Sequence, residues 1–196
     1  MSKAANTRLT ILQKAFELIY SKGYQTTSID EIIATTQVTK GAFYYHFKTK
    51  DEMGVAIIEE ILKPTMLGSF IKPIENSENP IEDFYNMIYY LLLEDPLLEV
   101  KYGCPVGNLT QEMTPWNNQF SLALSELVNQ WMMTIEKAIV RAQTLGLVRK
   151  EVNGEQVAFF VMSGYWGIRN FGKLQDSNLC YIVYLKEFRN YLNSLK

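Results

Sequence analysis

The stretch TTSIDEIIATTQVTKGAFYYHFKTKDEM, residues 26–53, carries the signals of two short helices joined by a tight turn. Ser28, followed three residues later by Glu31, forms a capping box and predicts the start of the first helix. A turn over residues 35–38 separates it from a second helix over about residues 39–47. Two short helices joined in this way and preceded by a supporting helix are typical of a helix-turn-helix.

The second helix of this stretch is predicted to have one apolar and one polar face. Phe43 and Phe47 are four residues apart, so both can point into a small core. Tyr45 lies on the opposite side, because each residue turns the helix by about 100°. Thr39 and Lys40 stand at its N-terminal tip, the part of a recognition helix that meets base edges. The flank opposite the phenylalanines is therefore small, polar and aromatic, a shape that a DNA major groove accepts.

The rest of the chain also has helical patterns. Apolar spacing and capping signals predict further helices over about residues 7–22, 49–63, 80–95, 115–145, 154–172 and 177–196. Residues 97–114, which contain GCPVGNL, are predicted to be the least regular part. Since no β-branched alternation suggests a strand, the predicted fold class is all-α.

Composition and charge narrow the class of protein. Hydrophobic residues make up 47% of the 196 residues, enough for a substantial core. No apolar run approaches the ~20 residues of a membrane helix, and the N-terminus lacks the apolar stretch of a secretion signal, so we expect a cytoplasmic protein without membrane contact. Residues 1–50 carry a net charge of +4 and the remainder −6, which suggests a localised anionic partner.

Residues 26–53 resemble the DNA-binding region of the TetR family of bacterial transcription regulators. The resemblance covers about residues 8–60 and depends on the run KGAFYYHF, followed by KTK and an acidic pair. It implies base contacts by Thr39, Lys40, Ala42 and Tyr44, with the small Gly41 beside them, and phosphate contacts by Thr27, Ser28, Tyr45, His46, Lys48 and Lys50.

The turn departs from the family's usual Ala-Gly-Val. This chain has Thr36-Gln37-Val38, so a residue other than glycine must occupy the left-handed position. That conformation costs about 1–2 kcal/mol.

The resemblance also implies a division of the chain. We expect a helix-turn-helix DNA-binding domain over residues 1–48, a connecting helix over about residues 49–63, and a larger helical ligand-binding and dimerisation domain over residues 64–196. The last two predicted helices are apolar on nearly all sides, which favours a homodimer built through them. A twofold dimer would place two recognition helices ~34–36 Å apart over a palindromic site.

Aromatic residues and methionines of the middle helices are candidates for a small-molecule pocket, although each is also an ordinary core residue. GCPVGNL resembles a segment that a subset of the family has beside its pocket. The ligand-binding candidates are Tyr89, Cys104, Met113, Trp116, Phe120, Trp131, Phe160 and Trp166. Together they suggest an apolar or aromatic effector.

The predicted function is a ligand-responsive DNA-binding transcription regulator, with a repressor favoured. Sensing of oxidants or electrophiles through Cys104 is one alternative. A helical enzyme is another, but the only histidine, His46, lies in the predicted DNA site and leaves no catalytic or metal-binding constellation. A nonspecific architectural DNA binder would be basic overall, whereas this chain has a net charge of −2. Because the chain shows no catalytic or metal-binding constellation, we expect no catalysis, cofactor or metal.

Overall fold

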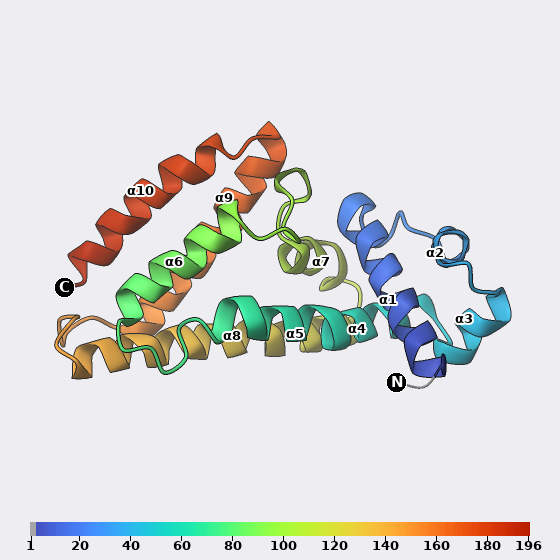
Figure 1. The fold of residues 1–196 in the computed structure, drawn as a ribbon, viewed down its shortest axis with the longest axis horizontal. Helices are drawn as coiled ribbons and strands as arrows, with labels where there is room; N and C mark the ends of the chain where they lie inside the picture. Colours follow the sequence, from blue (N-terminus) through green and yellow to red (C-terminus); the bar gives the residue numbers. More distant parts are fainter. Residues whose placement is uncertain (1–2) are drawn as a thin grey trace. The chain divides into compact units, whose positions relative to one another are not determined.

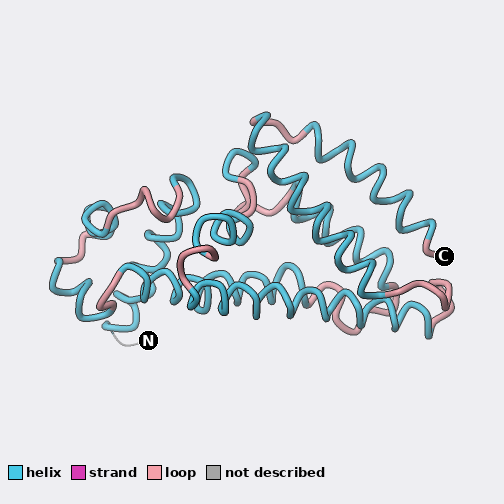
Figure 2. The backbone as a smooth tube through the Cα atoms, turned by 180° about the vertical axis from the view of Figure 1, so that it is seen from behind, coloured by secondary structure: helices cyan, strands magenta, loops and turns pink. Residues whose placement is uncertain are grey.

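The computed structural model describes residues 3–196, which form helices and loops without a strand among them (Figure 1, Figure 2). The all-α prediction is confirmed. The α-helices are α1 (Lys3–Lys22), α2 (Ile29–Thr36), α3 (Lys40–His46), α4 (Lys50–Ile57), α5 (Lys63–Met66), α6 (Pro80–Leu93), α7 (Pro105–Met113), α8 (Asn118–Thr144), α9 (Gly154–Gln175) and α10 (Leu179–Ser194). Short π-helical turns form η1 (Ile58–Leu62) and η2 (Leu67–Ile71), and a 3-10 turn forms η3 (Val100–Tyr102). None of the helices within residues 3–196 is both long and apolar enough to cross a bilayer.

The helices pack into two compact units. The first contains the residues up to Thr65 together with Pro105–Ser125, and the second contains Met66–Cys104 and Glu126–Lys196. The sequence predicts one boundary near residue 64, whereas α7 and the first turns of α8 pack with the N-terminal helices. Residues 1–2 of the expected N-terminal domain lie outside the described residues.

The helix-turn-helix forms as the capping signals predict. Both hydrogen bonds of the capping box between Ser28 and Glu31 are present at the start of α2. Gln37 ends this helix in the left-handed conformation, with φ 57° and ψ 18°. This is the position at which the resemblance predicts a positive φ. Phe43 and Phe47 are fully buried, so the apolar face of α3 is confirmed.

Two parts of the chain differ from the predicted helices. Residues 105–113 form α7 although the sequence pattern there is weak, because Pro105 is compatible with a first helical turn and Val106, Leu109 and Met113 are buried. Pro64 does not end its helix, which continues through α5 into η2. The π-helical turn η1 lies directly before it, and such turns change the backbone pairing that a proline would otherwise disrupt.

Two tyrosines of α10 pack closely against glycines of α9 in the second unit. A Cβ atom at Gly172 would lie 2.3 Å from the hydroxyl oxygen of Tyr181, and one at Gly164 would lie 2.7 Å from that of Tyr184. Glycine at these two positions lets α10 pack directly against α9. Arg169 of α9 is fully buried, and its guanidinium donates to the Gly103 carbonyl at 2.5 Å.

Candidate nucleic-acid interface

Helix α3 presents an exposed flank opposite its buried phenylalanines. Thr39 caps the helix, since its hydroxyl accepts from the Ala42 N–H at 3.2 Å. The side chain of Tyr45 is 79% exposed and that of Tyr44 is 44% exposed, and Thr39 and Gly41 are exposed as well. A short helix with small and polar groups on its free flank has the form needed to enter a major groove.

Cations lie at both ends of α3. The ammonium group of Lys40 is 3.1 Å from the carboxylate of Asp30, and this hydrogen bond raises the pKa of Lys40. The pair is exposed on both sides, so water or a phosphate can replace it at little cost. Lys48 is exposed just after the helix, and His46 is half-buried at its end.

Arg8 holds the end of α3 in place. Its guanidinium donates to the His46 carbonyl at 3.1 Å and lies 4.3 Å from the centre of the Phe47 ring. The same group pairs with Glu60 at 2.5 Å. Arg8 therefore ties α1 to the end of the recognition helix and to η1.

The residues before α2 divide into one exposed and one buried side chain. Ser28 is exposed, and its hydroxyl also serves the capping box. The side chain of Thr27 is only 1% exposed, and its hydroxyl donates to the Gly23 carbonyl at 2.7 Å. This corrects the expectation that the Thr27 side chain contacts a phosphate, because its hydroxyl stabilises the turn after α1.

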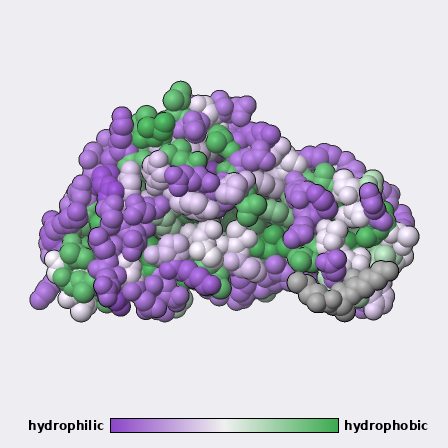
Figure 3. Space-filling view, viewed as in Figure 1, coloured by the Kyte–Doolittle hydropathy of each residue, from purple (hydrophilic) through white to green (hydrophobic). Residues whose placement is uncertain are grey.

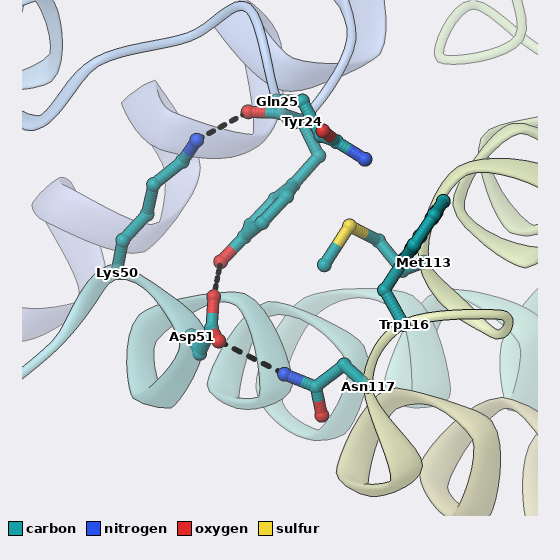
Figure 4. Close-up of a pocket in the computed structure, with 7 residues that line it drawn as sticks. All are labelled: Tyr24, Gln25, Lys50, Asp51, Met113, Trp116 and Asn117. Carbon is teal, nitrogen blue, oxygen red and sulfur yellow. Dashed lines mark hydrogen bonds between the residues drawn. The ribbon is translucent and has the colours of Figure 1, made fainter.

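Lys50 belongs to a hydrogen-bond network centred on Tyr24 (Figure 4). Its ammonium donates to the Tyr24 carbonyl at 2.5 Å and lies 4.2 Å from the centre of the Tyr24 ring. Partial burial lowers the pKa of Lys50, against the influence of Glu112 and Asp51. A phosphate contact by Lys50 therefore requires the ammonium to exchange or share its bond to Tyr24.

The same network fixes α7 and the start of α8 to the N-terminal helices. The carboxylate of Glu112 accepts from the backbone N–H groups of Tyr24 at 2.8 Å and Gln25 at 2.6 Å. Asp51 accepts from the Tyr24 hydroxyl at 2.6 Å and from the Asn117 side chain at 2.9 Å. Burial, followed by the bond to Asp51, raises the pKa of Tyr24. One tyrosine thus connects α1, α4 and α7.

The predicted ligand-binding residues are spread over both units. Met113 and Trp116 line a groove of about 500 Å³ beside Tyr24, Lys50 and Asp51. Phe120 of the same unit is buried and packs edge-on against Tyr24. In the second unit Cys104 and Trp131 are buried, Tyr89 and Phe160 are exposed, and Trp166 is half-buried. Burial restricts the access of an oxidant or electrophile to the Cys104 thiol.

Several residues of this interface carry no recognisable signal in the sequence. Glu112 lies 87 and 88 positions from the two N–H groups that it accepts from, and only the folded chain brings them together. Tyr24 follows the glycine that ends α1 and looks like an ordinary loop residue. Asp51 is part of the acidic pair in the family-like run, but nothing in that run indicates its bond to Asn117.

A capped recognition helix, a left-handed turn and a supporting helix define a helix-turn-helix DNA-binding protein. Comparison with known protein families supports the same class of protein. Residues 11–57 match the family described as "Bacterial regulatory proteins, tetR family", and residues 88–186 match "Tetracyclin repressor-like, C-terminal domain". The second match alone covers half of the chain. The chain therefore belongs to the TetR family of DNA-binding transcription regulators.

Individual relatives are similar over most of the chain. An uncharacterized HTH-type transcriptional regulator of Lactococcus lactis subsp. lactis is 34% identical over 122 residues, which is 62% of this chain and 62% of that protein, less than two thirds of its length. The HTH-type transcriptional repressor DhaR of Mycobacterium sp. (strain GP1) is 23% identical over 167 residues, covering 82% of this chain and 79% of that protein. The crystal structure of regulatory protein TetR from Rhodobacter sphaeroides has the same fold, with a TM-score of 0.81 at 23% identity over 95% of this chain and 96% of that one.

Proposed function

We propose that the protein is a transcriptional repressor that binds a palindromic operator through α3 and is released by a small apolar or aromatic molecule. The observation that carries the DNA part is the exposed flank of α3 above two fully buried phenylalanines. Thr39, Lys40, Ala42 and Tyr44 would approach the bases, with Gly41 allowing close contact. Ser28, Tyr45, His46, Lys48 and Lys50 would hold phosphates.

A homodimer through α9 and α10 would supply the twofold symmetry of such an operator. Both helices carry large apolar side chains that the single chain leaves exposed, and Figure 3 displays apolar groups over the first turns of α10. The exposed set is Phe159, Phe160, Phe171, Leu174, Leu179, Ile182 and Val183. A second copy of the same surface would cover them.

The effector would act by binding the released state more tightly than the DNA-bound state. Couplings between two sites are typically about 1–3 kcal/mol, or 5- to 150-fold in affinity. A regulator of this kind would act in the cytoplasm, where the chromosome lies.

Footprinting on the DNA that flanks the protein's own gene tests the proposal. We expect protection of an inverted repeat, with the two half-sites one helical turn apart, and a binding constant that falls steeply with salt. Protection without an inverted repeat, or binding that is indifferent to sequence, would contradict it.

A further inference from the structure

A second groove lies in the second unit, between the end of η2 and one face of α6. Its volume is about 350 Å³, a size that suits a small organic molecule. Gly68, Ser69 and Pro73 line it on the η2 side. Asp83, Asn86, Met87 and Tyr90 line it from α6, where their spacing places them on one face.

The last turn of η2, whose residues line the groove, has two carbonyl groups without their usual backbone donor. In an α-helix the Gly68 carbonyl would accept from the Lys72 N–H, and the Ser69 carbonyl from the N–H of residue 73. The Lys72 N–H donates instead to the Leu67 carbonyl at 3.0 Å, and Pro73 has no N–H. Both carbonyls therefore lack their usual backbone donor, at the end of the helix where the macrodipole favours positive charge.

The α6 side adds a carboxylate. One oxygen of Asp83 accepts from the Ser77 hydroxyl at 2.5 Å, while the other has no hydrogen bond to any group within residues 3–196. Ser77 is itself held in place, since its carbonyl accepts from Arg141. Of the four acids in residues 72–83, Glu82 pairs with Arg189, and Arg141 lies against the Ser77 carbonyl. Asp83 is the charged side chain that lines the groove itself.

Packing does not explain the glycine in this helical segment. A Cβ atom at Gly68 would meet nothing within 4 Å. Glycine is unfavourable inside a helix, and a larger residue would fit sterically. A larger side chain at this position would instead fill the groove.

We propose that this groove binds a small aromatic ammonium ion. Its charge would lie against Asp83 and the helix-terminal carbonyls, and its ring would pack on Met87 and on the half-exposed ring of Tyr90, which also attracts cations. The site goes beyond the proposed repressor function and depends on no residue of the DNA interface.

Titration of the DNA-free protein with benzylamine, followed by NMR or calorimetry, tests the site. Benzyl alcohol and benzoate are the matched neutral and anionic probes. We expect benzylamine to bind at least tenfold more tightly than either probe, because neither benzyl alcohol nor benzoate can form the hydrogen-bonded charge pair with Asp83. Equal binding of the three compounds, or no binding of benzylamine, would overturn the proposal.

Three variants locate the site. Asp83→Asn should weaken benzylamine binding about tenfold or more. Gly68→Leu, which introduces a good helix former and retains Asp83, should do the same by filling the groove. Glu75→Gln makes the same charge change on the exposed loop outside the groove and should bind like the unchanged protein. Benzylamine affinity unchanged in Gly68→Leu, or equally reduced in Glu75→Gln, would show that the amine binds elsewhere or through general charge. Since the readout contains no DNA, its failure leaves the proposed repressor function untouched.

Discussion

Replacement of Glu112 by alanine tests whether α7 is fixed to the N-terminal helices through Tyr24. The change removes the carboxylate that accepts from the N–H groups of Tyr24 and Gln25. A hydrogen bond to a charged acceptor contributes about 1.5–3 kcal/mol to stability. The Gln25 N–H lies at the exposed surface, where water replaces the carboxylate, whereas the Tyr24 N–H is half-buried. We therefore expect a loss of about 2 kcal/mol in the free energy of unfolding, from the Tyr24 bond chiefly.

Urea denaturation at neutral pH, followed by far-UV circular dichroism and tryptophan fluorescence, measures this loss. Glu112→Gln keeps one acceptor oxygen and should lose about half as much. Gln111→Ala, an exposed change on the same helix, is the control and should stay within about 0.5 kcal/mol of the unchanged protein. If Glu112→Ala were as stable as this control, the bonds from Glu112 would not hold α7 in solution.

Three further predictions concern packing, acid stability and DNA binding. Gly54→Ala would place a Cβ atom 2.4 Å from Phe120 and 2.7 Å from Tyr24, so it should destabilise the protein by about 1–3 kcal/mol. Gly68→Ala meets no neighbouring atom and should stabilise the protein by about 0.5–1 kcal/mol. Melting temperatures of the two variants that shift in the same direction would disprove this prediction. Lys22, followed by the Ser28 backbone N–H and hydroxyl, lowers the pKa of Glu31 from 4.5 to about 2. The contribution of Glu31 to the free energy of unfolding is therefore present above pH 4.5 and is lost as the pH falls toward 2. In acid titrations Glu31→Gln should lack this part of the stability loss, and an acid profile equal to that of the unchanged protein would refute the prediction. Lys50→Ala should weaken binding to all DNA sequences alike and lower the slope of log affinity against log salt by about 1. An unchanged slope would show that the Lys50 ammonium bonds to Tyr24 and contacts no phosphate.

The local signals of the helix-turn-helix are strong enough to be recognised without coordinates. The Ser28 capping box and the inward-facing Phe43 each follow from a few neighbouring residues, whereas the left-handed position at Gln37 is implied by the resemblance to the family's turn. Long-range bonds are different, because no short segment indicates that Glu112 reaches the turn after α1. Thr27 illustrates the same point, since a hydroxyl beside α2 suits a phosphate by type, and only the folded turn buries it.

The middle of the chain could be predicted least. The sequence suggests an irregular segment over residues 97–114, yet burial of Val106 and Leu109 stabilises α7 there. Pro64 suggests a helix end, but the preceding π-helical turn lets the helix continue. In both cases packing and backbone adjustment outweigh local preference.

Selection of bound duplexes from a random DNA library tests the central claim, that the free flank of α3 reads a double-stranded groove. The unchanged protein should enrich one inverted repeat, and Tyr44→Phe or Thr39→Ala should change the preferred bases within each half-site. Glu75→Gln, far from α3 in the sequence, should enrich the same repeat. A library that emerges without any preferred sequence, or a preference that the α3 variants leave unaltered, would contradict the account.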